Sequence, residues 1–117
     1  MLERAFTASW HADVRDCYLI GLTRWSQTVA DEYDALIRRA VEDVVSDPTG
    51  LLNRHRPDLG AEDVRIRPLS ASRHSGSLII KPAHFVVFRY LEGDTLVRFV
   101  RLVRGAALVP HLISEAK

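Results

Sequence analysis

The stretch from His84 to Arg104, HFVVFRYLEGDTLVRFVRLVR, decides the fold. Its first part, Phe85 to Tyr90, is rich in β-branched and aromatic residues, and Thr95 to Arg104 has the same character, so each part predicts a strand. Glu92-Gly93-Asp94, which lies between them, is typical of a hairpin loop. The stretch therefore predicts an antiparallel pair of core strands.

The N-terminal half predicts one strand and two helices. Leu2 to Thr7 alternates weakly and predicts a short strand. Ser9 stands where a helix N-cap belongs, and it is followed by an apolar stripe made up of Trp10, Val14, Cys17, Gly21 and Trp25. A second stripe predicts a helix from Val29 to Val45, which ends at Asp47-Pro48-Thr49-Gly50. Two consecutive helices with a short joint predict an antiparallel helical hairpin.

The middle of the chain connects these helices to the C-terminal strands. Leu51 to Glu62 has no periodicity and predicts a loop, whereas Val64 to Arg67 alternates apolar and basic residues and predicts a strand. The predicted order is β-α-α-β-β-β. We therefore predict a single α+β domain over residues 1–117, in which the N-terminal helical hairpin packs on a small, mainly antiparallel sheet.

Composition excludes several classes of protein. Apolar residues make up 47% and charged residues 26% of the 117 residues, which is ordinary for a globular domain. Neither an apolar run long enough to cross a bilayer nor an apolar signal segment is found in the sequence, so we expect a cytoplasmic protein. The single cysteine, Cys17, excludes an internal disulfide, and its place on an apolar stripe predicts a small core residue.

The charges are unevenly distributed along the chain. Acidic residues outnumber basic ones before Pro48, and basic residues outnumber acidic ones after it, which favours a polyanionic or acidic partner for the C-terminal half. Alternation in the last strand predicts Arg98 and Arg104 on one face and Arg101 on the other. Guanidinium groups suit phosphate and carboxylate binding; the alternative is that the charges only solvate the sheet. The candidate target-binding residues are Arg65, Arg67, Arg73, His74, Arg89, Arg98, Arg101 and Arg104.

Catalysis has weak support in the sequence. No metal-ligand spacing, glycine-rich phosphate loop or nucleophile elbow is found, so we predict no metal and no cofactor. The one reaction that the residue types fit is metal-free cleavage of RNA, which needs a base, an acid and cations for the phosphorane charge. The candidate residues for it are Arg104, His84 and Lys81. We expect an inhibitor that acts by binding rather than an enzyme.

Several short motifs together resemble one known family, the ParE/RelE toxins of bacterial type II toxin–antitoxin pairs. Arg56-Pro57-Asp58-Leu59-Gly60 resembles the R-P-E-L-G loop of the ParE-type members. The other similar motifs, in chain order, are Ala12-Asp13-Val14, Ala30 with Tyr33, His84-Phe85-Val86-Val87-Phe88-Arg89-Tyr90 and Val100-Arg101-Leu102-Val103-Arg104-Gly105-Ala106. The resemblance covers about Phe6 to Ile113 and is closer to ParE.

The resemblance implies a toxin that poisons DNA gyrase by binding and is neutralised by a cognate antitoxin. The alternatives are a RelE-like endoribonuclease that cleaves mRNA on the ribosome, and an inactive member that only binds its antitoxin. No tyrosine follows Tyr90, whereas RelE-type enzymes use a C-terminal tyrosine. Ala107 stands where many ParE-type members carry Arg or Met, and Leu108 stands where Asp is usual. Trp10 and Tyr18 are the candidate antitoxin-binding residues, because aromatic side chains are common interface anchors.

Overall fold

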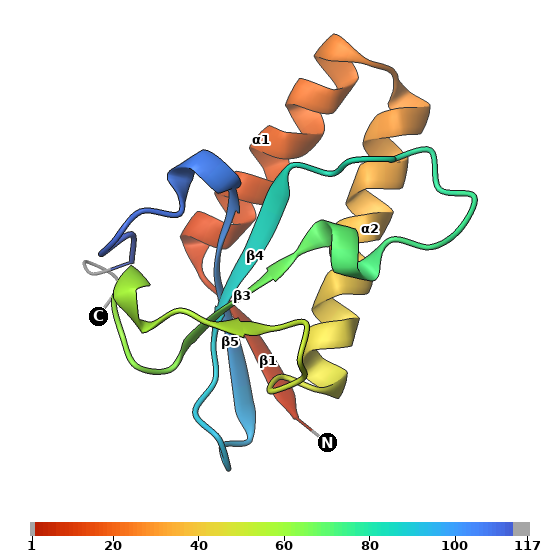
Figure 1. Ribbon diagram of the computed structural model, residues 1–117. Coiled ribbons are helices and arrows are strands. Elements are labelled where there is room, and N and C mark those ends of the chain that lie inside the picture. Colours follow the sequence, from red (N-terminus) through yellow and green to blue (C-terminus); the bar gives the residue numbers. More distant parts are fainter. Residues whose placement is uncertain (1, 114–117) are drawn as a thin grey trace.

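A computed structural model describes residues 2–113, which form two helices against one face of a sheet (Figure 1). The elements, in chain order, are β1 (Glu3–Phe6), α1 (Ala8–Arg24), α2 (Gln27–Ser46), β2 (Arg54–His55), the 3₁₀ helix η1 (Pro57–Leu59), β3 (Val64–Pro68), the 3₁₀ helix η2 (Leu69–Ser72), β4 (His84–Arg89), β5 (Leu96–Arg104) and the 3₁₀ helix η3 (Gly105–Ala107).

The sheet has five strands in the order β1-β5-β4-β3-β2. β1 runs parallel to β5, and the other neighbouring pairs are antiparallel, so the predicted α+β class and mainly antiparallel sheet are confirmed. The prediction of a plain loop from Leu51 to Glu62 was wrong, because β2 and η1 lie within it. A strand of two residues is too short to show a periodicity of two.

The first helix begins earlier than the sequence predicted. Thr7, not Ser9, is its N-cap: the Trp10 amide donates a hydrogen bond of 3.0 Å to the Thr7 hydroxyl. The same hydroxyl donates to the Val100 carbonyl oxygen of β5 at 2.9 Å. Thr7 therefore caps α1 and fixes its start to the longest strand of the sheet.

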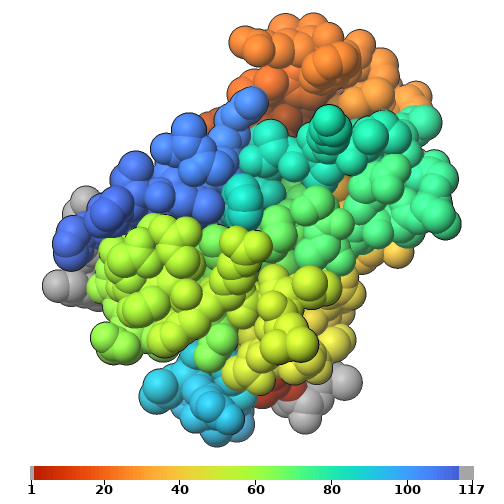
Figure 2. Space-filling model, in the orientation of Figure 1, coloured from red at the N-terminus to blue at the C-terminus, as the bar shows by residue number. Residues whose placement is uncertain are grey.

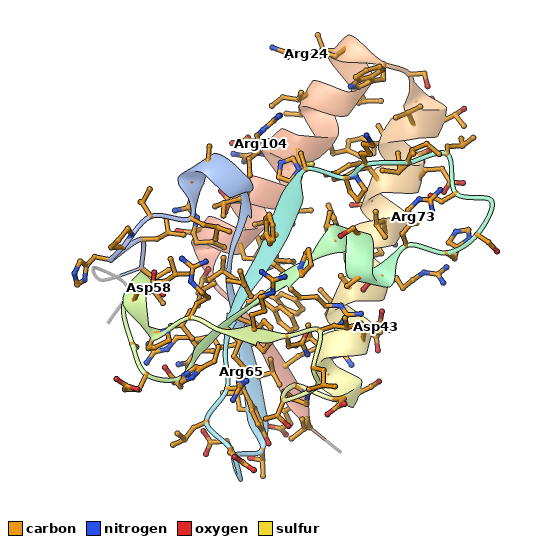
Figure 3. All side chains as sticks on the ribbon, viewed as in Figure 1. Arg24, Asp43, Asp58, Arg65, Arg73 and Arg104 are labelled. Carbon is orange, nitrogen blue, oxygen red and sulfur yellow. The ribbon has the colours of Figure 1, made fainter. Side chains whose placement is uncertain are left out.

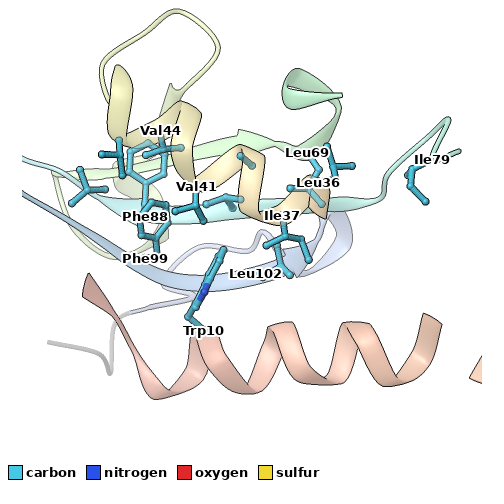
Figure 4. Close-up of a cluster of buried hydrophobic side chains, with 14 residues drawn as sticks. Trp10, Leu36, Ile37, Val41, Val44, Leu69, Ile79, Phe88, Phe99 and Leu102 are labelled. Carbon is cyan, nitrogen blue, oxygen red and sulfur yellow. The ribbon is translucent and has the colours of Figure 1, made fainter. Parts of the chain in front are cut away.

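The helices and the sheet enclose one hydrophobic core, which we call the helix-side core. Trp10 projects from α1 into it and lies against Phe99, with ring centroids 5.5 Å apart (Figure 4). The predicted stripe of α2 supplies most of the opposing surface, through Leu36, Ile37, Ala40, Val41 and Val44. The predicted amphipathic pattern of α2 is thus confirmed.

The opposite face of the sheet is covered as well. Leu59, Val64, Ile66, Val87, Val100, Val103 and Ile113 form a second buried cluster, which we call the far-side core. The C-terminal segment lies against the segment that contains η1 (Figure 2). Two main-chain hydrogen bonds join them, from the His111 amide to the Asp58 carbonyl oxygen and from the Ile113 amide to that of Leu59.

A β-bulge in β5 changes which residues share a face. Phe88 pairs with Phe99 while Val87 pairs with Arg101, so Val100 is the extra residue. Phe99 and Leu102 face the helix-side core, whereas Val100 faces the far side. The predicted alternation therefore holds from Val97 to Val100 and is wrong beyond Val100, because strict alternation assumes a regular strand.

The first helix is apolar on more than one side. Only Trp10 is buried on it, and Leu19, Ile20 and Leu22 stay exposed. Trp25, which the predicted stripe placed toward the core, is 73% exposed at the end of the helix. The helix ends there, so the position that continues the stripe in sequence no longer lies over the sheet.

Candidate functional site

A polar cluster lies on the helix-facing side of the sheet, where β4 begins and β5 ends. His84 and Arg104 are ladder partners at this place. Tyr33 reaches it from α2, with its Oη atom 2.7 Å from His84 Nδ1. The Ala83 amide donates a second hydrogen bond to the same hydroxyl at 3.2 Å. We call Tyr33, His84 and Arg104 the Arg104 cluster; sequence analysis named Tyr33 in a family-like motif with Ala30 but not among the candidate site residues.

The imidazole of this cluster favours its neutral form. Burial lowers the pKa of His84 and the positive charge of Arg104 lowers it further, while Asp13 acts in the opposite direction. Tyr33 Oη accepts the Ala83 N–H and can donate its own proton to Nδ1; in that arrangement the ring proton of neutral His84 lies on Nε2. Burial is also the main cause that raises the pKa of Tyr33 to about 12, so the hydroxyl is protonated at neutral pH.

The lone cysteine lies next to this cluster and packs against the helix-side core, as predicted. Burial is the main cause that raises the pKa of Cys17 to about 11; Asp34 adds to the effect and Arg104 opposes it. The thiol is therefore protonated at neutral pH, and a protonated thiol is a poor nucleophile.

Arg104 is the exposed member of the cluster. Its side chain makes no hydrogen bond or ion pair with any residue from 2 to 113, and Figure 3 shows it beside the start of β4. A guanidinium that has no protein partner can present its planar fork to two oxygens of a phosphate or carboxylate. The cluster thus combines a free cation with a neutral imidazole that is held in place by Tyr33.

The other predicted cations do not form one surface with Arg104. The ladder places Arg65 and Arg67 on the helix-facing side, as it does Arg104, but on another strand of the sheet. Arg89 and Arg98 pair with each other on the opposite side. The prediction that Arg98 and Arg104 share a face was wrong, because the bulge in β5 lies between them.

Arg67 is a structural residue. Its side chain is buried, and it donates from Nε to the Ser72 hydroxyl at 2.8 Å and from Nη1 to Asn53 Oδ1 at 3.1 Å. Nη2 donates to the Ala71 carbonyl oxygen at 3.0 Å and lies 3.3 Å from Asp43 Oδ2. We call this set the Arg67 junction. An open cavity of about 320 Å³ lies over it.

Two further arginines are held by carboxylates. Arg89 Nε lies 3.0 Å from Asp63 Oδ1. Arg101 Nε lies 2.7 Å from Asp13 Oδ2, which also accepts the Leu102 amide at 2.9 Å. Asp13 of α1 therefore closes the open edge of β5 beyond the end of β1. Sequence analysis quoted Asp13 only as part of a family-like motif.

The remaining candidates lie in the connection between β3 and β4. Arg73 donates from Nε to the Ile79 carbonyl oxygen. His74 Nδ1 lies 2.8 Å from the Ser75 carbonyl oxygen, and its side chain is exposed. Lys81 is exposed and, within residues 2–113, has no hydrogen bond or ion pair that joins it to the Arg104 cluster. Arg65 is half-buried, and its Nε has no hydrogen-bond partner within the same residues.

The two predicted antitoxin contacts differ in exposure. Trp10 is 3% exposed and belongs to the helix-side core, so its side chain offers almost no surface to a partner of the folded domain. Tyr18 is partly exposed, and its hydroxyl donates to Asp31 Oδ1 of α2 at 2.6 Å. Leu22 and Trp25, which continue the same flank of α1, are exposed.

The stretch Arg56–Gly60 is an ordered part of the far side. Arg56 donates from Nε and Nη2 to the two carboxylate oxygens of Asp58, each at 2.9 Å. Leu59 is fully buried in the far-side core. Gly60 has a φ of 146°, a conformation that other residues rarely adopt.

The C-terminal segment explains two departures from the ParE-type pattern. Ala107 and Leu108 pack against the far-side core. A charged side chain at either place would need a partner in an apolar environment. The apolar residues at these positions therefore fit their packing against the far-side core.

Among residues 2–113, no three His, Cys, Asp or Glu side chains are grouped so that they could hold a metal ion. Neither of the described helices is long and apolar enough to cross a membrane.

Comparison with known proteins shows the fold. No protein-family model matches the chain, and no curated protein is detectably similar to it in sequence. A solved structure described as the chromosomal ParDE toxin–antitoxin (TA) system from P. aeruginosa superposes with a TM-score of 0.62 and 18% sequence identity. The match covers 89% of this chain and 96% of the other. The two chains therefore share the same fold over nearly their whole lengths.

Proposed function

We propose that this chain is a ParE-like toxin of a type II toxin–antitoxin pair, acting in the cytoplasm. The observation that carries the proposal is that a fold shared with a chain of a ParDE system also contains the ParE-like motifs in order. Two of these motifs have defined structural roles: Arg56–Gly60 closes the far-side core, and Val100–Ala106 includes the bulge and Arg104.

In this proposal the toxin poisons DNA gyrase by binding, without catalysis of its own. Gyrase bound to DNA is a polyanionic target, and Arg104 is the cation free to meet it, with His74 exposed on the neighbouring connection. Arg98 is exposed as well, but on the opposite side of the sheet. Arg67, Arg89 and Arg101 keep the fold together and are not assigned to the target.

The test is inhibition of DNA supercoiling by purified gyrase. The wild-type chain should inhibit the reaction and induce the DNA-damage response when it is expressed. Arg104→Ala should weaken inhibition by about 10-fold, the loss expected for one charge-assisted contact, whereas Arg39→Ala, which removes an exposed arginine of α2, should not. Full supercoiling in the presence of the wild-type chain, together with no damage response, would exclude gyrase as the target.

The proposed toxin is silenced by a cognate antitoxin. The flank of α1 that carries Tyr18, Leu22 and Trp25 is an exposed aromatic and apolar surface on which an amphipathic segment can pack. The experiment is co-purification with the product of the neighbouring reading frame. Trp25→Ala should weaken that complex, and growth arrest that the neighbouring product does not relieve would contradict the pairing.

A second candidate function, RNA cleavage on the ribosome, is favoured by one observation: neutral His84 lies beside the free cation Arg104. Arg104 would stabilise the phosphorane charge. Rotation of the Tyr33 hydroxyl would let Nδ1 carry the ring proton, which makes His84 Nε2 the base. Translating ribosomes should then yield discrete mRNA fragments that disappear with Arg104→Ala; intact mRNA would dismiss this function.

A further inference from the structure

The outer side of α1 carries an apolar patch that nothing in residues 2–113 covers. Leu19 is 50% and Ile20 is 54% exposed, and they are consecutive residues on the C-terminal half of the helix. A helix that is apolar on several sides is usually covered on those sides. In this chain the helix-side core covers only the side of Trp10.

Two opposite charges flank this patch at equal distances along the helix. Asp16, Ile20 and Arg24 follow one another at steps of four residues and so lie on one stripe. Leu19 is turned about 100° away from Ile20 around the helix and lies between this stripe and Leu22. The Asp16 carboxylate is 63% exposed, and its ion pair with Arg15 is long, at 3.6 Å. The Arg24 side chain is exposed and has no ion pair or hydrogen bond with residues 2–113. The stripe therefore carries an acidic, an apolar and a basic side chain, in that order along the helix.

We propose that this stripe binds a second copy of the same chain, through antiparallel packing of the two α1 helices about a two-fold axis at Ile20. The axis relates position i to position 40 − i, so Ile20 meets Ile20 and Asp16 of each copy lies opposite Arg24 of the other. Both ion pairs form at once, because an isologous interface repeats every contact. A parallel arrangement would place like charges together.

The charge pattern fits a second copy because the stripe is complementary to itself when it is reversed. The proposed interface is separate from the flank of Tyr18, Leu22 and Trp25, so it does not depend on the assignment of an antitoxin. One helix face buries less area than a permanent dimer requires. The dimer is therefore weak and forms in a concentration-dependent manner.

The experiment measures the mass of the purified chain by sedimentation over a concentration series. The wild-type chain should pass from monomer to dimer. Asp16→Arg and Arg24→Asp each place like charges opposite one another twice, and each should raise the dimer dissociation constant about 10-fold. An equimolar mixture of the two variants should dimerise again, because one copy then carries both positive charges and the other both negative charges.

Controls separate this interface from misfolding and from other surfaces. Each variant should keep the helical circular dichroism of the wild-type chain, and Trp25→Ala should dimerise as the wild-type chain does. Ile20→Glu should abolish the dimer. A wild-type chain that stays monomeric at its highest soluble concentration would overturn the proposal, as would single charge variants whose mixture stays monomeric.

Discussion

The Arg67 junction and the Arg104 cluster use the same side chain in opposite ways. Both arginines lie on the helix-facing side of the sheet and near α2. Arg67 is 7% exposed and bonds to three side chains and one carbonyl oxygen. Arg104 is exposed and has no such partner within residues 2–113. A basic residue on this sheet is thus either part of the scaffold or available to a partner.

The difference arises from where each arginine sits along its strand. Arg67 lies inside β3, where η2 and the segment after α2 close over it and supply Ser72 and Asn53. A buried guanidinium is tolerated only when such groups replace its water. Arg104 is the last residue of β5, where the chain turns away and solvent remains. The number of arginines in the sequence therefore overestimates the cations that can bind a target.

The sharpest test of this contrast is to remove each charge and keep the length of the side chain. Arg67→Met should lower the free energy of unfolding by about 3 kcal/mol, because the buried oxygens that Arg67 satisfies lose their donor. Arg104→Met should change it by less than about 0.5 kcal/mol. Urea unfolding measures the free energy of unfolding of both variants. Equal losses would contradict the distinction between a structural Arg67 and a free Arg104.

A smaller effect is expected inside the Arg104 cluster. Tyr33→Phe removes the hydroxyl that accepts the Ala83 amide and lies against His84 Nδ1. We expect a loss of about 1 kcal/mol, the usual size for a part-buried hydrogen bond. Unfolding measurements on Tyr33→Phe and on Tyr90→Phe make a matched pair, because within residues 2–113 the Tyr90 hydroxyl bonds only to the exposed Asp94 carbonyl oxygen. A larger loss at Tyr90 would contradict this role for Tyr33.

The smallest expected effect is a pH dependence. The pKa of His84 in the folded chain lies below its ordinary value of 6.5. Its contribution to stability is therefore fully present above about pH 6.5 and is lost as the pH falls toward the folded pKa. Between about pH 7.5 and about pH 5, the melting temperature should drop more for the wild-type chain than for His84→Gln. Parallel pH profiles would show that His84 does not titrate differently on folding.

Much of the fold follows from local patterns in the sequence. The stripe of α2 and the strands β4 and β5 are predictable because their periodicity extends over many residues. The bulge at Val100 is not, since it depends on how β5 pairs with β4 and on the Thr7 hydroxyl reaching the Val100 carbonyl oxygen. One extra residue then reverses the side of the sheet that the residues from Leu102 to Arg104 face.

The candidate site was only partly predictable, for a related reason. His84 and Arg104 were candidates by residue type, but their pairing depends on the register of two strands. Tyr33 was missed because a tyrosine among the apolar residues of α2 is expected to be a core residue. Nothing in the sequence indicates that its hydroxyl bonds to His84. Asp13 and Asn53 were missed as scaffold residues because they satisfy main-chain or guanidinium groups on distant elements. No local spacing encodes these contacts.

The parallel pairing of β1 with β5 has a consequence for the order in which the chain can fold. Thr7 bonds to a residue 93 positions later, and Glu3 pairs with Leu96. The strand that pairs with β1 is thus made after both helices and the other strands, and contacts of such high sequence separation slow folding. Until β5 has been made, the helical hairpin lacks Phe99 and Leu102, on which its apolar faces pack. A chain in synthesis therefore cannot complete its native sheet before β5 has emerged.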